Sequence, residues 1–244
     1  MKTLSVVDAG VVPYVTALRW QKELHTRRVA DEMGDVLLLL EHPHVYSLGR
    51  RFADQHLIAS RQELAARGIE VHESDRGGSI TYHGPGQLVA YPIIDLRRPD
   101  RDLPDTIKYL RILEEAIIRT VRAFGLISTR RESMTGVWVG DSKLAAIGVN
   151  ISQGVSRHGL AINVTTDLSF FEGMIPCGLE GRSVTSLDSL GVPARMDQVK
   201  RQLSSELATL FHRVQVPLTK RELGIETKEP GAEIIALHRK SASA

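Results

Sequence analysis

The sequence predicts an α/β (α+β) fold in which a mixed sheet is packed with helices. Two observations support this prediction. The middle of the chain contains short aliphatic runs separated by glycine-containing turns, which is typical of strands, and amphipathic segments lie on either side at 102–124 and 196–213. No internal repeat and no linker rich in glycine and serine precedes residue 218. We therefore expect one domain over residues 1–217 and a polar tail over 218–244, with a small C-terminal subdomain as the alternative.

The composition is that of an ordinary soluble protein, because 42% of the 244 residues are hydrophobic and 25% are charged. A chain of this length can bury a full core. The formal net charge is +2 and the basic residues are scattered, so no nucleic acid partner is expected, while an acidic protein partner is permitted. The longest apolar run, 36–40, is too short to cross a bilayer, and the first residues lack the apolar core of a signal peptide. We expect a cytoplasmic protein that does not enter membranes.

The N-terminal part of the chain predicts a helix followed by a strand. Residues 13–33 carry Val15, Leu18 and Leu24 at helical spacing among charged residues. The aliphatic run at 36–40 is typical of a buried strand.

A short helix is predicted after residue 60. Ser60 and Glu63 have the spacing of a capping box, and Gly68 is suited to end the helix. The alternation and the aliphatic runs that follow predict three strands, at 69–72, 79–83 and 88–94.

The segment 102–124 is the clearest helix in the sequence, and Gly125 stands just beyond its end. We expect it to be a core helix whose apolar face consists of Ile107, Leu110, Ile117, Ile118, Val121 and Phe124. Three further strands are predicted at 137–139, 144–151 and 159–164, before the last helix at 196–213.

Cys177 is the only cysteine in the chain. It lies between Pro176 and Gly178, which interrupt helices and strand pairing, so the thiol is placed on a turn. This position favours a chemical role, and the alternative is a small buried hydrophobic residue. A single cysteine excludes an internal disulfide framework and a cysteine-based zinc site, and it indicates a reducing compartment.

The segment from Asp75 to Gln87 contains the highest density of polar and glycine residues. Paired glycines at 77–78 let backbone amides approach a ligand, and the glycines around His83 hold an imidazole at the end of a strand. This pattern suits a binding cleft, and a hairpin with ordinary turn glycines is the alternative. The segment has neither the P-loop order nor Gly-x-Gly-x-x-Gly, so no motif supports nucleotide binding.

These motifs together resemble those of the lipoate-protein octanoyltransferases. The longest matching segment is Arg76–Val89, and it is followed by Tyr91-Pro92-Ile93. The resemblance covers roughly residues 5–215, in order and without a missing block. The other matching segments are Leu40–Pro43, Tyr46–Arg50, Gly136–Val139, Lys143–Val149, His158–Val164, Ile175–Gly178 and Val184–Leu187.

The resemblance implies a fold shared with biotin and lipoate protein ligases, and an acyltransferase activity. In this family, the cysteine that matches Cys177 takes octanoate from octanoyl-acyl carrier protein as a thioester, with the lysine that matches Lys143 as its partner in a Cys/Lys dyad. The amine of a lipoyl-domain lysine then attacks to form an amide. The implied acceptors are the lipoyl domains of 2-oxoacid dehydrogenase complexes and the H protein of the glycine cleavage system.

The resemblance also implies a substrate pocket, and it implies no cofactor and no metal. The pocket residues are those that match Arg76, Gly77, Gly78, Ser79, Ile80, Thr81, Tyr82, His83, Ala146, Ile147, Gly148, Gly159, Leu160 and Ala161.

The physical chemistry agrees with this assignment. A cation beside a thiol favours the thiolate, so a lysine from another strand is a credible activator. Thioester exchange onto Cys177 is close to energy-neutral and aminolysis is downhill, so no ATP is expected. The residues themselves do not identify Lys143 as the activator, because a lysine on a strand is usually a solvated surface residue.

The remaining polar residues have open roles. His83 could hydrogen-bond the acyl carbonyl, steer the incoming amine or accept its proton. His42-x-His44 is better explained by a proline-containing turn than by metal binding, and we expect His158 to be structural or pocket-lining. Arg76 either orients the glycine loop or contacts the phosphopantetheine or protein partner, with a surface salt bridge as the alternative.

Two rival functions are kept. An ATP-dependent lipoate or biotin ligase on the same fold would not need Cys177, and ligases of lipoate have a sequence resembling His-Asp-x-Gly-Asn where this chain has His83–Gln87. A silent protein that binds an acylated carrier would be favoured if the Cys/Lys pair were absent, and both residues are present.

Overall fold

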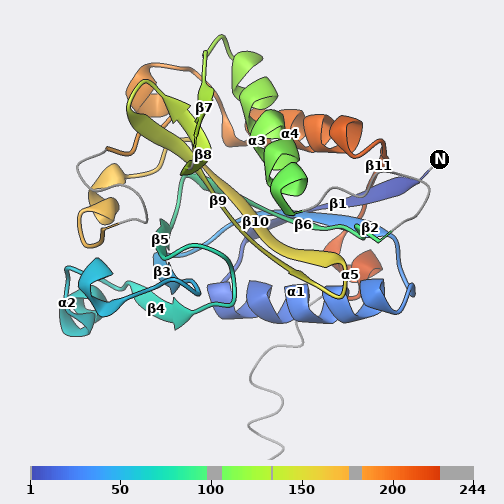
Figure 1. The fold of residues 1–244 in the computed structure, drawn as a ribbon, viewed down its shortest axis with the longest axis horizontal. Coiled ribbons are helices and arrows are strands. Elements are labelled where there is room, and N and C mark those ends of the chain that lie inside the picture. Colours follow the sequence, from blue (N-terminus) through green and yellow to red (C-terminus); the bar gives the residue numbers. More distant parts are fainter. Residues whose placement is uncertain (1, 98–105, 133, 176–182, 226–244) are drawn as a thin grey trace, which may run out of the picture.

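The computed structural model describes residues 2–97, 106–132, 134–175 and 183–225. Helices cover both faces of one large mixed sheet, and a small second sheet lies to one side (Figure 1). The predicted mixed α/β fold is confirmed. The helices, including the short 3-10 turns, are α1 (Tyr14–Val29), η1 (Asp54–His56), α2 (Arg61–Ala66), α3 (Thr106–Arg122), η2 (Leu168–Phe171), η3 (Asp188–Leu190), α4 (Met196–Leu210) and α5 (Lys220–Leu223).

The large sheet has eight strands in the order β11-β1-β2-β6-β10-β9-β8-β7, and the small sheet has the order β4-β3-β5. β1 pairs in parallel with β2 and β11, while the pairs from β2 to β7 across the sheet are antiparallel. The strands are β1 (Thr3–Val11), β2 (Asp35–Glu41), β3 (Val45–Leu48), β4 (Glu70–Glu73), β5 (Ile80–His83), β6 (Gln87–Ile93), β7 (Thr129–Arg131), β8 (Met134–Val139), β9 (Ser142–Ser152), β10 (Val155–Asn163) and β11 (Val214–Pro217).

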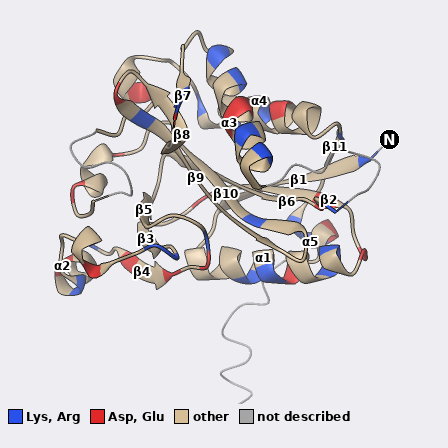
Figure 2. Ribbon diagram, viewed as in Figure 1, with Lys and Arg blue, Asp and Glu red and all other residues tan. Residues whose placement is uncertain are grey.

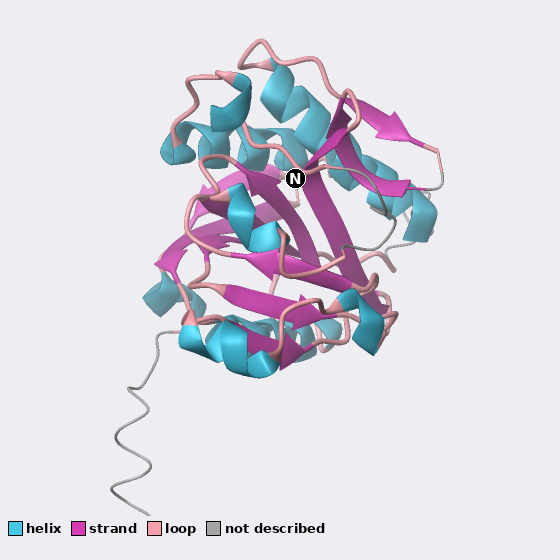
Figure 3. Ribbon diagram, turned by 90° about the vertical axis from the view of Figure 1, so that its left-hand side faces the viewer, coloured by secondary structure: helices cyan, strands magenta, loops and turns pink. Residues whose placement is uncertain are grey.

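The helix α1 covers one face of the large sheet, and α3 and α4 cover the other (Figure 3). The helix predicted within 13–33 is confirmed, but it ends at Val29. Val15 is 53% exposed because the buried face is formed by Tyr14, Ala17, Trp20 and Leu24. The helix at 102–124 is also confirmed from Thr106 onward, and its start lies outside the described residues. The prediction of its apolar face is wrong at Ile107, which is 68% exposed, whereas Tyr109 is buried.

The small sheet and α2 form a separate cluster around Tyr46, Leu64 and Tyr82. The predicted capping box is confirmed, because the N–H of Glu63 donates to Ser60 Oγ at 3.2 Å and the carboxylate of Glu63 accepts from the N–H of Ser60 at 2.8 Å. Figure 3 shows this sheet on the side of the molecule that carries α1. The small sheet therefore lies over one end of the large one.

Residues after 217 contribute to the packed structure. Leu223 and Ile225 are buried with α1 residues such as Trp20 and Leu24. The packed part of the chain thus continues through Ile225, beyond the predicted domain boundary at 217. The remainder of the predicted tail, 226–244, lies outside the described residues.

Charged residues of both signs are interspersed along the helices (Figure 2). In the part of the chain that the structure describes, no helix has the length and apolar character needed to span a bilayer.

Candidate active site

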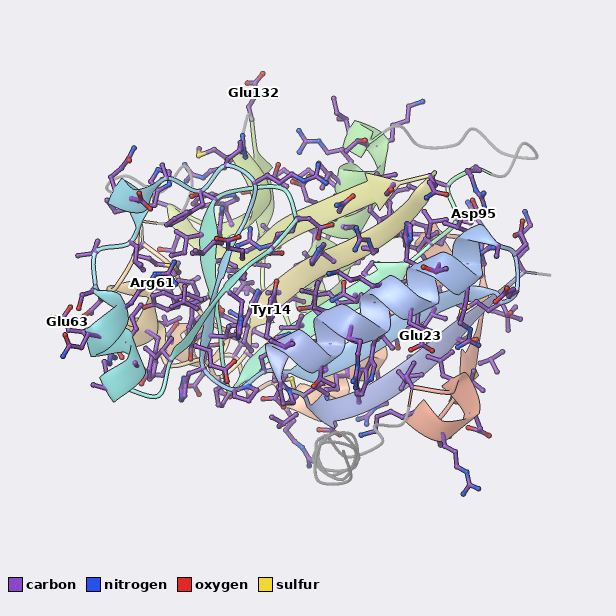
Figure 4. The ribbon with its side chains drawn as sticks, turned by 90° about the horizontal axis from the view of Figure 1, so that it is seen from below. Tyr14, Glu23, Arg61, Glu63, Asp95 and Glu132 are labelled. Atoms are coloured by element: carbon purple, nitrogen blue, oxygen red, sulfur yellow. The ribbon has the colours of Figure 1, made fainter. Side chains whose placement is uncertain are left out.

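A pocket of about 830 Å³, including its open mouth, lies between the large sheet and the small one. Its floor comes from β6, β9 and β10, and its opposite wall comes from the segment that leads into β5. Tyr14, which lies at the first turn of α1 (Figure 4), is also among the lining residues. The predicted residues that line it are Arg76, Gly77, Gly78, Ser79, Ile80, Thr81, His83, Lys143, Ala146, Ile147, Gly148, Gly159, Leu160 and Ala161.

Tyr82 is the predicted pocket residue that the structure places elsewhere. Its side chain is fully buried in the core of the small sheet, where it packs edge-on against Tyr46 and its hydroxyl shares a hydrogen bond of 2.8 Å with His44 Nδ1. Side chains alternate between the two sides of a strand, so Thr81 and His83 face the pocket while Tyr82 faces away.

The pocket also contains residues that the sequence did not single out as its lining. On β6 these are Gln87, Val89 and Tyr91, and on β10 Asn163 joins Gly159 and Ala161. Each set follows the two-residue period of a strand, which is the signal that could have identified them. The other additions are Tyr14, Ala145, Phe171 and Val184, and His158, which was expected to be structural or pocket-lining, also lines the pocket.

Arg76 is buried and organises the glycine loop, as one of its predicted roles required. Its guanidinium donates to the carbonyl of Ser47 at 2.5 Å and to the carbonyl of Gly77 at 3.0 Å. The loop approaches the sheet closely because Gly148 has no side chain: a Cβ there would lie 2.8 Å from the carbonyl oxygen of Gly77. Arg76 therefore supports the wall of the pocket from inside. The alternative prediction, that Arg76 forms a salt bridge at the surface, is wrong because its side chain is buried.

The side chain of Asp75 joins the same loop to β9 and β10. Its carboxylate accepts hydrogen bonds from His158 Nε2 at 2.7 Å and Asn150 Nδ2 at 2.8 Å, and it faces Arg157. These contacts hold the pKa of Asp75 well below its usual range. Burial lowers the pKa of His158 and outweighs the contact with Asp75, so this ring is neutral near pH 7. His158 thus lines the pocket and anchors its wall, as the sequence predicted.

Lys143 reaches the pocket through an irregularity in β9. The register pairs Val137 with Ala145 but Trp138 with Lys143, so β9 holds one extra residue, Leu144. A bulge of this kind re-aims the side chains next to it. Leu144 is buried in the core beside α3 and does not line the pocket, whereas Lys143 does.

The backbone of Lys143 is joined to the segment that follows Cys177. Its N–H donates to the carbonyl of Ser183 at 3.0 Å, and its carbonyl accepts from the N–H of Thr185 at 2.9 Å. The chain just before Cys177 is also fixed, because the N–H of Ile175 donates to the carbonyl of His56 at 2.8 Å. Cys177 itself lies in 176–182, outside the described residues.

A chain of side-chain amides fixes the tautomer of His83. The amide nitrogen of Asn163 donates to the carbonyl of Thr185 at 2.9 Å, and the Asn163 oxygen accepts from Gln87 Nε2 at 2.9 Å. Gln87 Nε2 also donates to the carbonyl of Tyr82, which leaves the Gln87 oxygen to accept from His83 Nδ1 at 2.7 Å. Burial lowers the pKa of His83 to about 3, so the ring is neutral and its Nε2 carries a lone pair.

His42 is held in the same way. Its Nδ1 donates to the carbonyl of Val12 at 2.6 Å, so the Nε2 of the neutral ring accepts from the hydroxyl of Tyr91 at 2.8 Å. Burial lowers its pKa to about 4. Among the described residues, no group of three or more His, Cys, Asp or Glu side chains is arranged to hold a metal ion.

The family model described as the lipoyl protein ligase A/B catalytic domain matches residues 13–208. The curated octanoyltransferase of Chloroflexus aggregans is 46% identical, over 86% of this chain and 96% of its own. The curated octanoyltransferase of Solibacter usitatus is 44% identical, over 89% of this chain and 97% of its own.

Solved structures show the same fold at low sequence identity. A bipartite lipoate protein ligase from Thermoplasma acidophilum superposes with a TM-score of 0.71 and 18% identity, over 92% of this chain and 91% of the other. A lipoate-protein ligase A bound with ATP gives a TM-score of 0.69 and 15% identity, over 92% of each chain. The predicted ligase-like catalytic fold is confirmed.

The fold and the sequence together define a lipoyl protein ligase A/B catalytic domain. The chain belongs to this family and, within it, to the octanoyltransferases, which makes it an acyltransferase.

Proposed function

We propose that this protein transfers an octanoyl group from octanoyl-acyl carrier protein, through a thioester on Cys177, to a lysine of lipoyl domains. The acceptors are the lipoyl domains of 2-oxoacid dehydrogenase complexes and the H protein of the glycine cleavage system. This transfer is the first step of endogenous protein lipoylation, and we place it in the cytoplasm, whose reducing conditions keep a lone thiol free.

The observation that carries the proposal is the position of Lys143. Its side chain lines a largely apolar pocket, and its backbone is hydrogen-bonded to Ser183 and Thr185, in the segment that continues the chain from Cys177. A cation beside a thiol favours the thiolate, which is the nucleophile. The apolar residues Val89, Ile147 and Leu160 suit an aliphatic acyl chain.

In the first half-reaction, the thiolate of Cys177 attacks the carbonyl carbon of the donor thioester. The bond from this carbon to the phosphopantetheine sulfur breaks, and the released thiol takes a proton that the ammonium of Lys143 is suited to supply. In the second half-reaction, the acceptor amine attacks the same carbon. An amide bond forms, the Cys177 sulfur leaves, and the amine's proton passes to Lys143.

The tautomer of His83 favours one of the three roles that the sequence left open. Its Nδ1 hydrogen is already donated to Gln87, so the neutral ring has no hydrogen to offer the acyl carbonyl. Its Nε2 lone pair is available to an N–H of the incoming amine. With a pKa of about 3 the ring is a weak base near pH 7, so we assign His83 to steering the amine.

The experiment that tests this function is intact-mass spectrometry after incubation with octanoyl-acyl carrier protein. We expect one added octanoyl group that hydroxylamine removes and that Cys177→Ala abolishes. Since Cys177 is the only cysteine, no other thiol can accept the group. A Cys177→Ala variant that transfers octanoate at the normal rate would disprove the covalent mechanism.

The same assay separates the two rival functions. Transfer to an apo-lipoyl domain should proceed without ATP or magnesium. If free octanoate is activated only with ATP, and the thioester donor is inert, the protein acts as a ligase. If carrier protein binds and no octanoyl group reaches either Cys177 or the acceptor, it is a silent binding protein.

A further inference from the structure

We propose that Gly136 and Trp138 on β8 form a clamp for the side chain of Lys143, which makes Trp138 a positioning residue for acyl transfer. The inference rests on the proposed function, in which Lys143 activates Cys177. It gives a role to Gly136–Val139, a segment of the family pattern that the pocket and the thiol chemistry leave unexplained.

Trp138 supplies an aromatic surface for the Lys143 ammonium. The two residues are direct partners in the register of β8 and β9, and the Lys143 Nζ lies 4.9 Å from the centroid of the Trp138 ring. This distance is within the range in which the electron-rich face of an indole attracts a cation. Trp138 is 0% exposed, so water competes little for the side of the ammonium that faces the ring.

The indole is itself fixed by Arg131. The guanidinium carbon of Arg131 lies 5.1 Å from the same ring centroid, and its NH2 donates to the carbonyl of Gly140 at 2.6 Å. Arg131 and Trp138 belong to the paired strands β7 and β8. The position of the ring that faces Lys143 is therefore fixed both by the pairing of β8 with β7 and by the contact with Arg131.

Gly136 leaves the space through which the Lys143 side chain runs. Its φ is +130°, a conformation that favours glycine, and a Cβ there would lie 3.2 Å from Lys143 Cε and 2.6 Å from the carbonyl oxygen of Ala145. The N–H of Gly136 donates to Glu114 Oε1 at 3.1 Å, and this carboxylate is 1% exposed and paired with Arg111 and Arg130. The floor of the clamp is thus anchored to α3.

The clamp restricts a long, flexible side chain to one path across β8. A lysine without such contacts samples many rotamers, and only a fraction of them would place the ammonium beside a reacting thiol. Trp138 should increase the fraction of Lys143 side chains whose ammonium lies beside the thiol, because the indole contacts Lys143. It should not act on the substrate directly, because it is not among the residues that line the pocket.

The test compares Trp138→Leu with Trp138→Phe. The rate at which iodoacetamide alkylates Cys177 at neutral pH, and the kcat of octanoyl transfer, should fall roughly tenfold or more in the leucine variant. The phenylalanine variant, which keeps an aromatic face, should recover most of both rates. The KM for octanoyl-acyl carrier protein should change little, because Trp138 does not line the pocket.

Two controls separate positioning from loss of packing. In a Lys143→Met background, the Trp138→Phe and Trp138→Leu changes should have no further effect on alkylation. Trp20→Leu removes the other tryptophan, which is buried with α1, and should lower the melting temperature without slowing alkylation.

Equal alkylation rates in wild type, Trp138→Phe and Trp138→Leu would overturn the clamp, as would a Trp138 effect that persists without Lys143. If Trp138→Leu does not fold, Gly136→Ala decides the question by the same cycle with Lys143→Met, because its added methyl group would lie 3.2 Å from Lys143 Cε. The alkylation assay needs no acyl donor. Failure of octanoyl transfer by the wild type would therefore refute the proposed function and leave the clamp to be judged on alkylation.

Discussion

At the scale of single residues, the chemistry of the site depends on groups whose protonation is set by their contacts. His83 and His42 each donate from Nδ1 to an oxygen, and burial keeps both rings neutral. Lys143 lines the pocket, and its backbone is hydrogen-bonded to Ser183 and Thr185, in the segment that follows Cys177. The proposed reaction therefore needs the charge of Lys143 and the lone pair of His83 in fixed places.

Lys143→Met tests the proposed charge directly. Methionine keeps much of the length of the side chain but removes the charge and the transferable proton. We expect the thiol of Cys177 to titrate at higher pH and to alkylate more slowly at neutral pH, because the thiolate loses its neighbouring cation. Octanoyl transfer should fall by roughly two to four orders of magnitude, as is usual for the loss of a positioned acid–base group.

The measurements are an alkylation-versus-pH profile and a transfer assay. Lys22→Met, on the exposed side of α1, is the matched control and should leave both unchanged. If the Lys143→Met profile and its transfer rate both match wild type, Lys143 and Cys177 are not coupled, and another group such as His83 activates the thiol.

At the scale of secondary structure elements, the pocket depends on strands that approach one another without side chains between them. Gly148 and Gly159 are direct partners in the register of β9 and β10. Gly148 admits the glycine loop, and Gly159 packs on β6, where an added Cβ would lie 2.1 Å from the carbonyl oxygen of Ala90. The alternation along β6 and β10 then decides which side chains form the floor.

Gly159→Ala should therefore destabilise the protein and distort the pocket floor. The added methyl group collides with backbone, which cannot move without shifting β6, so we expect a loss of roughly 1–3 kcal/mol in the free energy of unfolding. Urea denaturation measures this loss. Gly34→Ala is the matched control, because the only contact that the new Cβ would make there is at 3.8 Å. Equal unfolding midpoints for the two variants would contradict the close approach of β10 to β6.

At the scale of the whole molecule, a buried network of ion pairs lies at the end of α1 that is far from the pocket. Arg28 donates to Asp35 at 3.0 Å and to Asp95 at 3.0 Å, and Arg213 lies 2.8 Å from Asp35. These side chains join α1, β2, the segment after β6 and the start of β11. Figure 4 shows Tyr14 and Asp95 near opposite ends of α1. The pocket and the network are thus separated by the length of this helix.

The buried histidines make the stability of the whole molecule depend on pH. In the unfolded chain a histidine has a pKa of about 6.5, whereas the pKa of His42 is about 4 and that of His83 is about 3 in the folded protein. As the pH falls below about 6.5, the unfolded state binds protons that the folded state does not. Stability is therefore lost progressively between about pH 6.5 and the two folded pKa values.

His42→Gln tests this dependence. Each buried histidine contributes a slope of up to about 1.4 kcal/mol per pH unit, and the variant should lose one such contribution between about pH 6 and 4.5. The slope is measured from urea denaturation at several pH values. His212→Asn, at an exposed position with φ of +53°, is the control and should keep the wild-type slope. A slope in His42→Gln as steep as that of wild type would refute the buried neutral ring.

Much of this molecule is determined by local sequence. The 3.6-residue and two-residue periods placed α1, α3, α4 and the central strands, since these patterns report which side of an element is buried. Ser60 and Glu63 marked the start of α2 because a capping box is a local hydrogen-bond pattern. The family motifs placed every predicted pocket residue except Tyr82 at the pocket, but they did not single out further lining residues such as Tyr14, Tyr91 and Asn163.

The rest was decided by contacts between distant segments. The strands β1 and β11 were not predicted, because each becomes a strand by pairing with a partner far along the chain. The same holds for Ile225, whose burial depends on α1 rather than on its own polar surroundings in the sequence. Lys143 faces the pocket only because of the bulge at Leu144, and strict alternation along β9 from Gly148 and Ala146 would have placed Leu144 there. A period tells which residues share a face, but a register shift and the partner strand determine where that face points.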